Sequence, residues 1–291
     1  MLMGGISGSG PADTAALGGI LIPSMEKAGY PKEYASATLA AAGSIGAIIP
    51  PSITMVVLAG ILSQSVGSML MAGLIPGILI GVLMMVTSGV ICHRRQYAIS
   101  DKTEFSWNKL GRSLKNAVLA LLAPIIIVGG IVAGIFTATE ASVVVCIYTL
   151  FIGIFVYKTV KLSDLNELFT NAIVSSANVL LIIGICAGFS WVLTYNNFPA
   201  AVTSLILNIS SSKLVIVLLI NIIFLIGGMF MEGLALILMF VPIFMPVMAS
   251  VGVSPMTFGV MVLINVVIGT LTPPVGVCLF VASSISGASV T

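Results

Sequence analysis

Long apolar segments, each about as long as a bilayer is thick, fill most of the middle of this chain. Four of them run without interruption, at residues 68–92, 117–137, 139–157 and 172–195. About 20 apolar residues in a helix, rising 1.5 Å each, cross the hydrocarbon core. The pattern therefore predicts four transmembrane helices.

Two further apolar segments, nearer the ends, are interrupted by paired prolines. Residues 35–62 contain Ile49-Pro50-Pro51-Ser52, and residues 255–283 contain Thr272-Pro273-Pro274-Val275-Gly276. Proline removes a backbone donor and clashes with the preceding helical turn. In lipid, the freed carbonyls are costly unless they line a cavity or bind a ligand. We therefore predict two broken helices whose breaks face the inside of the protein.

The two interrupted segments belong to an internal repeat. When Pro23 is aligned with Pro246, one register without gaps superimposes prolines, glycines and apolar residues of the two ends. The matched pairs are Pro23 and Pro246, Met25 and Met248, Gly29 and Gly252, Ile45 and Ile268, Gly46 and Gly269, Pro50 and Pro273, and Pro51 and Pro274. Such self-similarity indicates a duplicated structural unit.

A hairpin is expected before each broken helix. In the second copy, residues 214–230 and 233–249 form two short legs around a glycine-rich tip, which predicts a re-entrant hairpin. In the first copy the tip is residues 4–13, and only the return leg, to about Lys27, follows. The incoming leg is absent, so we expect the chain to be N-terminally truncated relative to a complete transporter half.

Composition and charge placement support a membrane protein with inverted repeats. The chain is 59% hydrophobic and 7% charged, whereas soluble domains carry about 25% charged residues. If the loop at 94–115 is cytoplasmic, the Gly29 turn and the 158–171 loop lie on the same side. Ten of the eleven Lys and Arg residues are then inside, and only Lys213 is outside. Four spans between the copies make them inverted, which is typical of secondary transporters.

Other polar or reactive residues are expected to have structural roles. Glu140 is interpreted as a helix-start charge that follows Thr139 as N-cap. The single histidine, His93, ends a helix beside two arginines, and residues 105–115 are expected to lie on the cytoplasmic surface. The cysteines sit in apolar runs and are predicted to be small core residues: Cys92, Cys146, Cys186 and Cys278.

The first hairpin tip carries candidate chemistry. Ser7-Gly8-Ser9 precedes a predicted helix start, where amides can hold an anion, and its hydroxyls and carbonyls can hold sodium. The alternative is that small residues only permit close packing. A carboxylate at membrane depth, as expected for Asp13, costs roughly 2.5–3.5 kcal/mol. Its functional role as an ion ligand is weighed against a dipole-complementing helix charge.

The second tip and both breaks supply further candidates. Glu232 is the only acidic residue after Glu167, and it requires an ion, a backbone nest or water as partner. Thr270 and Thr272 offer hydroxyls where the prolines free carbonyls, although Thr can also bond back to its own helix. Ser52 and Thr54, after the first break, allow the same two interpretations.

An ordered set of motifs along the whole chain resembles one known family. The motifs are Ser7-Gly8-Ser9 with Asp13, Pro23-Ser24-Met25, Gly29-Tyr30, Ile49-Pro50-Pro51-Ser52, Ala72-Gly73-Leu74-Ile75-Pro76-Gly77, Thr139-Glu140-Ala141 and Thr272-Pro273-Pro274-Val275-Gly276. Together they resemble the large membrane subunit of TRAP (tripartite ATP-independent periplasmic) transporters. In that family the second tip often carries Asp where this chain has Glu232.

The resemblance implies a function and an architecture. It implies an all-α polytopic protein of the bacterial inner membrane, with re-entrant hairpins and an elevator mechanism. Sodium would drive import of an organic anion, often a carboxylate, that a periplasmic binding protein delivers. A small membrane subunit would support the scaffold. No enzymatic activity, no cofactor besides Na⁺ and no nucleic acid is expected.

The resemblance also implies site residues and domains. Sodium ligands would be Ser7, Ser9, Asp13, Gly46, Ser52, Glu232, Thr270 and Thr272. Substrate would contact Ser7, Gly8, Pro50, Pro51, Pro273 and Pro274. Residues 1–62 and 213–291 would form the transport domain, and residues 63–212, with a cytoplasmic loop at 93–116, the scaffold and its connections.

Two other function classes fit parts of the pattern. Gly5-Ile6-Ser7-Gly8 matches the Gly-x-Ser-Gly motif of rhomboid-like intramembrane serine proteases, but such catalysis needs a histidine near the serine. The only histidine is predicted at a cytoplasmic helix end. Broken helices also line ion channels, whereas an inverted repeat favours alternating access.

Overall fold

The structure is a computed structural model that describes residues 7–97 and 106–289. Within these residues the chain is helical and contains no strand. It divides into two compact units. The first contains the described residues up to Tyr97 and those from Phe189 onwards, and the second contains those from Ser106 to Gly188.

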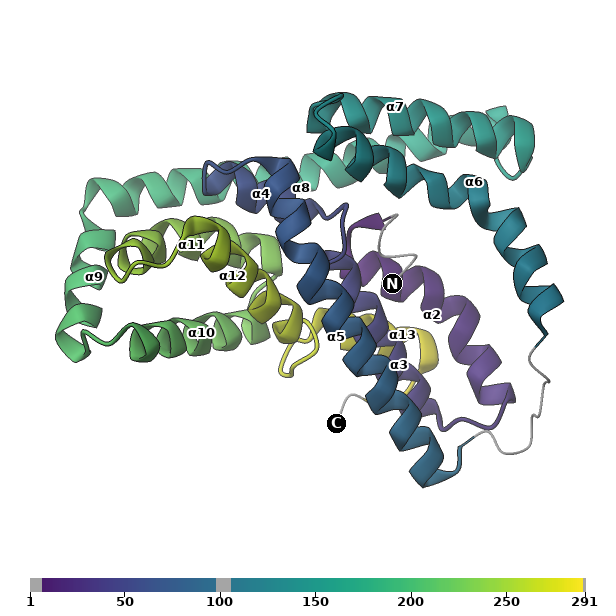
Figure 1. The fold of residues 1–291 in the computed structure, drawn as a ribbon, viewed down its shortest axis with the longest axis horizontal. Coiled ribbons are helices and arrows are strands. Elements are labelled where there is room, and N and C mark those ends of the chain that lie inside the picture. The colour runs from purple at the N-terminus through teal and green to yellow at the C-terminus, as the bar shows by residue number, and fades with distance from the viewer. Residues whose placement is uncertain (1–6, 98–105, 290–291) are drawn as a thin grey trace. The chain divides into compact units, whose positions relative to one another are not determined.

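The first unit contains both copies of the repeat (Figure 1). Its first copy contains α2 (Gly10–Lys27), α3 (Lys32–Ser44), the 3₁₀ turn η1 (Ile45–Ala47) and α4 (Ile53–Ile61), and it is followed by α5 (Val66–Arg95). After the end of α8 come α9 (Phe198–Ile209), α10 (Lys213–Phe230), α11 (Gly233–Ser250), α12 (Pro255–Gly269) and α13 (Val277–Ser286).

Helix boundaries confirm the duplication. Both α2 and α11 have 18 residues, and both ends of α11 fall where the repeat register places the ends of α2. The starts of α3 and α12 are equivalent in the same register. Each hairpin leg ends at a left-handed glycine, Gly29 with φ 90° and Gly252 with φ 68°, a conformation that glycine adopts without steric cost.

Both predicted interruptions are present at the paired prolines. The first lies between η1 and α4, and the second lies between α12 and α13. The Pro50–Pro51 and Pro273–Pro274 bonds are both cis. The two predicted hairpin legs are confirmed as α10 and α11. Re-entry of these legs into the membrane, and the transport and scaffold domains, remain predictions.

Close helix contacts join the two copies in the first unit. The helix α13 packs against α2 and α3, and its Cys278 is buried with Ala40 and Ala282. A Cβ on Gly10 would lie 3.1 Å from the Ser44 Cα. Small residues at these positions therefore let α2, α3 and α13 approach closely.

The second unit is built on a pair of antiparallel helices. α6 (Trp107–Val132) packs against α7 (Ala138–Phe151), which continues into a π-helical turn, η2 (Ile152–Val156). The Tyr148 hydroxyl donates to the Leu119 carbonyl across this pair at 2.8 Å. A short 3₁₀ turn, η3 (Leu162–Asp164), leads into α8 (Leu165–Tyr195), whose last turns belong to the first unit.

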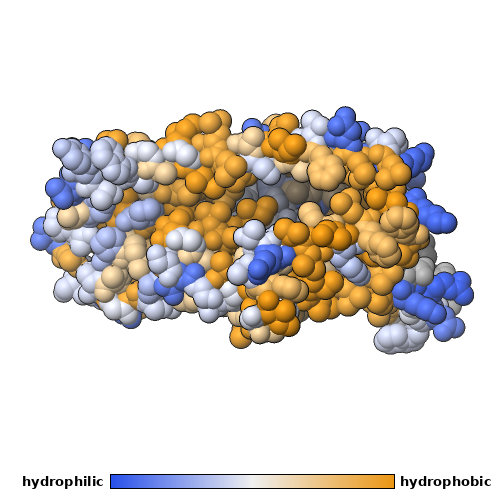
Figure 2. Space-filling model, turned by 90° about the horizontal axis from the view of Figure 1, so that it is seen from above, coloured by the Kyte–Doolittle hydropathy of each residue, from blue (hydrophilic) through white to orange (hydrophobic). Residues whose placement is uncertain are grey.

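The surface is apolar over wide areas (Figure 2). In the part of the chain that the structure describes, five helical segments are long and apolar enough to cross a membrane. They are 66–95, 138–156, 162–195, 213–230 and 233–250. α8 buries only 6% of its most apolar window inside the protein, as expected for a helix surrounded by lipid or other membrane helices.

The described part of the 105–115 segment is continuous with the span that follows it, because α6 begins at Trp107 and runs on without a break; its position at the cytoplasmic surface stays a prediction. Other sequence predictions about local structure were wrong. Thr137, not Thr139, is the N-cap of α7, and it forms a capping box with Glu140. Cys146 is exposed rather than in the core. The helix α9 was not predicted, because no glycine or proline pair marks it as a separate element.

Candidate ion and substrate site

The first hairpin tip touches the first break. The Ile53 amide donates to the Gly8 carbonyl at 3.4 Å. Gly8 has a φ of 65°, and a Cβ there would lie 2.6 Å from the Pro51 carbonyl oxygen. Only glycine therefore allows this approach. The part of the predicted tip at 4–6 lies outside the described residues.

The second tip touches the second break in a similar way. The Val275 amide donates to the Met229 carbonyl at 3.1 Å. A Cβ on Gly269 would lie 2.6 Å from the Gly228 backbone. In both copies, tip backbone thus meets the backbone of an interrupted helix.

The double prolines remove helical donors from two carbonyls in each copy. In a regular helix, Gly46 and Ala47 would accept from residues 50 and 51, which are prolines and have no N–H. The Ser52 hydroxyl donates to the Ala47 carbonyl at 2.5 Å. No described residue donates a hydrogen bond to the Gly46 carbonyl.

In the second copy, the equivalent carbonyls do have donors. The Thr272 amide donates to the Gly269 carbonyl at 3.0 Å, and the Cys278 amide donates to the Thr270 carbonyl at 3.1 Å. In the second break, both carbonyls that the prolines free therefore accept hydrogen bonds from nearby amides. In the first break, the Gly46 carbonyl accepts none from the described residues.

Asp13 lies one turn into α2 and is almost completely buried, with 2% of its surface exposed. Neither of its carboxylate oxygens has a hydrogen-bond partner among the described residues. The Ser7 hydroxyl lies near this carboxylate, and its hydrogen bond in the structure goes to the Ser9 carbonyl at 3.2 Å. A buried, unpaired carboxylate is strongly unfavourable unless a cation or donor meets it.

Asp13 shares its part of α2 with residues that pack against the approach to the first break. Gly10, three residues earlier, contacts Ser44, and Thr14 packs against Gly43. α2 also contacts η1, which contains Gly46. Residues three and four apart lie on one helix face. The unpaired carboxylate and the open carbonyl therefore belong to the same region.

Glu232 has a different environment. Its side chain is exposed and accepts from the Leu234 and Ala235 amides at 2.8 and 3.2 Å, as the N-cap of α11. The sequence allowed an ion, a backbone nest or water as the partner of Glu232, and in the structure its partners are backbone amides. Its position corresponds, in the repeat register, to Ser9.

Four candidate hydroxyls are engaged with backbone carbonyls, those of Ser7, Ser52, Thr270 and Thr272, whereas the Ser9 hydroxyl forms no cap hydrogen bond at the start of α2. Thr270 donates to Val267, and Thr272 donates to Ile268, both at 2.7 Å. Ser52, besides donating to Ala47, accepts from the Met55 amide at 3.3 Å as N-cap of α4. A hydroxyl oxygen that donates still has lone pairs for a cation.

The substrate candidates differ in accessibility between the copies. Gly8 and Pro50 are buried, whereas Ser7, Pro273 and Pro274 are exposed; Pro51 is half-buried. The first break is thus largely covered by its own tip, and the second break presents its proline pair at the protein surface.

A partly buried amide pair in the second copy was missed by sequence reasoning. The Asn265 side-chain amide donates to the Asn221 side-chain oxygen at 2.6 Å, joining α10 to α12. Asn221 also donates to the Val217 carbonyl at 2.7 Å. The sequence did indicate this contact, because asparagines in otherwise apolar helices tend to form hydrogen bonds between helices.

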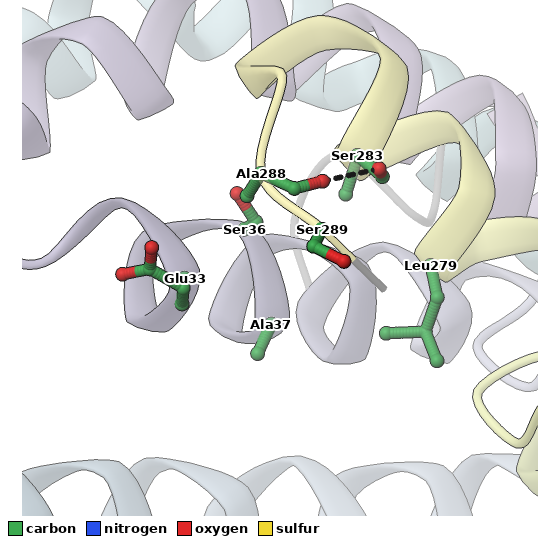
Figure 3. A pocket seen from close by; sticks show the side chains of 8 residues that line it. Glu33, Ser36, Ala37, Leu279, Ser283, Ala288 and Ser289 are labelled. Atoms are coloured by element: carbon green, nitrogen blue, oxygen red, sulfur yellow. Dashed lines mark hydrogen bonds between the residues drawn. The ribbon is translucent and has the colours of Figure 1, made fainter. Parts of the chain in front are cut away.

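A cavity of about 220 Å³ lies between the first half of α3 and α13 (Figure 3). Glu33 and Ser36 of α3 line it, together with Ser283 near the end of α13. The Ser283 hydroxyl donates to the Ala288 carbonyl at 2.5 Å. This cavity brings none of the candidate site residues together.

These features define a polytopic, all-helical membrane protein in which two copies of one motif bring hairpin tips to interrupted helices. The family model for the tripartite ATP-independent periplasmic transporter, DctM component, matches residues 1–291. The chain therefore belongs to the DctM family, the large permease subunits of TRAP transporters, and is a multi-pass inner-membrane protein.

Several named proteins are similar to the chain over nearly all its residues. It is 40% identical to the sialic acid TRAP transporter large permease protein SiaM of Vibrio cholerae over 285 residues, 98% of this chain and 66% of SiaM. It is 38% identical to the isethionate TRAP transporter permease protein DctMQ of Oleidesulfovibrio alaskensis, covering 100% of this chain and 46% of DctMQ. It is 36% identical to the C4-dicarboxylate TRAP transporter large permease protein DctM of Pseudomonas aeruginosa, covering 99% and 67%.

Proposed function

We propose that this chain forms the ion- and substrate-binding part of a sodium-coupled importer of organic anions. The observation that carries the proposal is the buried Asp13 carboxylate, which has no partner among the described residues. A cation at this carboxylate would remove the cost of the unpaired buried charge.

Sodium fits the available donors. Hard cations prefer oxygen ligands, and unwound carbonyls of broken helices coordinate Na⁺ in transporters with inverted repeats. Asp13 and the Gly46 carbonyl supply such oxygens in the first copy, and Ser52 lies at the same break. No cluster of three or more His, Cys, Asp or Glu residues suited to a transition metal is found in the described chain.

The anion would be held by backbone and hydroxyl groups rather than by arginine. The three arginines of the chain, Arg94, Arg95 and Arg112, lie far in sequence from both proline pairs. Tip residues Ser7 and Gly8 precede the start of α2, and helix starts favour negative charge. The names of the similar proteins above include sialic acid, isethionate and C4-dicarboxylate, whose common chemical feature is an acidic group.

Import would require partners. The chain spans about two thirds of SiaM and under half of DctMQ, so transport is proposed for a complete assembly. It would contain the remaining permease segments, a small membrane subunit and a periplasmic substrate-binding protein.

Uptake of a radiolabelled organic acid into proteoliposomes tests the proposal. We expect uptake by the complete assembly when an inward sodium gradient is imposed, and none when choline replaces sodium. Sodium-independent uptake would contradict the coupling. Single-channel currents in planar bilayers would replace the transporter model with a channel.

A further inference from the structure

The end of the α6–α7 pair where α6 begins combines apolar and basic side chains. We call this the α6–α7 end and define it as residues 107–118 and 151–161. It belongs to the second unit, whereas both helix breaks belong to the first.

An apolar stripe runs along the first turns of α6. Trp107, Leu110 and Leu114 are 77%, 47% and 53% exposed. At 100° per residue, these three side chains and the exposed Val118 fall within roughly 40° of a common line. Exposed apolar residues at this spacing form a face suited to the lipid boundary.

Basic residues lie beside the stripe. Arg112 and Lys115 are exposed and sit roughly 80–140° around the helix from Trp107. Lys158 and Lys161, in the turn that follows η2, are also exposed. Long basic side chains can bury their stems beside apolar surface while their charge reaches phosphate groups.

Packing brings both basic pairs to the same end. The Tyr148 hydroxyl bonds the Leu119 carbonyl, so the antiparallel helices are in register there. From that contact, α7 continues towards Lys158 while α6 runs back towards Arg112. Both segments therefore extend in the same direction beyond the contact.

The length of α6 places this end at headgroup depth. Its 26 residues span about 39 Å at 1.5 Å each, whereas the hydrocarbon core is about 30 Å thick and the bilayer with headgroups about 40–45 Å. Since residues 117–132 are its apolar part, the turns around Arg112 reach the interface. The exposed rings of Phe151 and Phe155, whose centroids are 5.2 Å apart, add apolar surface at the same end.

Nearby acidic groups only partly offset the positive charge. Asp164 is occupied by the Lys161 amide at 3.1 Å and the Ser163 hydroxyl at 2.9 Å. Glu167 lies in the first turn of α8. Basic residues thus outnumber these acidic ones by four to two.

We propose that the α6–α7 end is a binding surface for anionic phospholipid headgroups. The apolar stripe would enter the acyl boundary while Arg112, Lys115, Lys158 and Lys161 pair with lipid phosphates. Each basic residue at a membrane surface adds attraction to anionic lipid. A soluble acidic partner would match the charges but would leave Trp107, Leu110 and Leu114 in water.

Fluorescence of Trp107 can test the proposal directly. The chain has two tryptophans, and Trp191 lies in the other unit. In the purified subunit with Trp107 as its only tryptophan, Trp191→Phe included, quenching by brominated phosphatidylglycerol is compared with quenching by brominated phosphatidylcholine. We expect an apparent affinity at least about fivefold higher for the anionic lipid, which high salt weakens.

Charge removal supplies the decisive comparison. The variant R112Q/K115Q/K158Q/K161Q should show less than about a twofold preference for the anionic lipid, because these four charges attract it. The variant K27Q/K32Q/R94Q/R95Q removes four charges from the other unit and should keep the preference of the parent protein. Equal quenching by the two lipids in the parent protein would overturn the proposal, as would an unchanged preference in the first variant or a lost preference in the second.

Discussion

The two copies of the repeat have nearly the same backbone and different chemistry. α2 and α11 begin and end at equivalent positions of the repeat, yet Asp13 in the first corresponds to the fully buried Leu236 in the second. Glu232, the carboxylate of the second tip, corresponds to Ser9. One copy therefore buries an unpaired charge where the other buries a hydrocarbon side chain.

The backbone is shared between the copies, and the polar chemistry is not. Both copies have the glycines and prolines that shape the turns and breaks, because both form the same turns and interrupted helices. The polar groups are not shared, because only one copy has the open carbonyl and the buried carboxylate. The comparison predicts that equivalent substitutions in the two copies have unequal effects.

Asp13→Asn is expected to have the largest effect. Removing one partner of a buried charge pair costs roughly 3–5 kcal/mol, so sodium affinity should fall by about a hundredfold or more. The half-saturating sodium concentration for uptake by the complete assembly in proteoliposomes measures this change.

Thermal unfolding gives an independent measurement for Asp13→Asn. Sodium should raise the melting temperature of the parent protein, because it binds the folded state, and should have little effect on the variant. A variant that keeps both the sodium-dependent stabilisation and the parent half-saturation would remove Asp13 from the site.

Replacing the glycines at the contacts between tip and break should have the next largest effect, a loss of stability. Gly8→Ala would be destabilising by about 2–4 kcal/mol, because it combines a left-handed backbone with overpacking. Gly269→Ala should cost roughly 1–3 kcal/mol from overpacking alone. Gly60, where a Cβ meets nothing within 4 Å, is the control, and its change to alanine should be neutral or add about 0.5–1 kcal/mol.

Denaturation in detergent would measure these stabilities. If Gly8→Ala and Gly60→Ala had the same stability, the close contact between the first tip and Pro51 would be refuted. Measuring Gly269→Ala alongside them shows whether the second tip is held as tightly.

The amide pair of the second copy should make a smaller contribution. Asn265→Ala replaces this residue by the type that the first copy has at Ala42. Interhelical hydrogen bonds in membranes average about 0.6 kcal/mol, with a maximum of about 1.7. A double-mutant cycle with Asn221→Ala should give a coupling energy in this range, and a coupling of zero would show that the pair does not join α10 to α12.

Glu232→Gln is expected to have the smallest effect. The glutamine oxygen can still accept from the Leu234 and Ala235 amides, so only the interaction with the helix dipole, about 0.3–1 kcal/mol, is lost. Sodium half-saturation should change by less than about fivefold. A loss as large as that of Asp13→Asn would show that the second carboxylate binds the ion as well.

Local backbone features were predictable from sequence, whereas side-chain environments were not. Paired prolines and the glycines at 29 and 252 restrict the backbone wherever they occur, so they located the breaks and the hairpin ends. The register of the repeat, extended back to Gly10 and Gly233, would also have placed Glu232 at an N-cap. The sequence therefore did contain an indication that the Glu232 side chain bonds backbone amides, and it was missed.

The isolation of Asp13 depends on tertiary packing. Whether a carboxylate near a helix start is solvated, capped or buried is decided by helices distant in sequence, here α3 and α13. The cap of α7, by contrast, had a local indication that was missed. Thr137 precedes Glu140 by three residues, which is the capping-box spacing, and Thr139 does not.

The bond between Lys213 and the Gly252 carbonyl, 2.9 Å long, has a consequence for how cargo would arrive. Under the predicted topology, Lys213 is the single basic side chain on the periplasmic face, and its ammonium group is already committed to the closed end of a hairpin. The carbonyl is neutral, so the ammonium group keeps its charge, but one positive charge on that face of this chain attracts a distant anion only weakly. From the charges of this part alone, the rate at which a free anion reaches that face would depend only weakly on ionic strength.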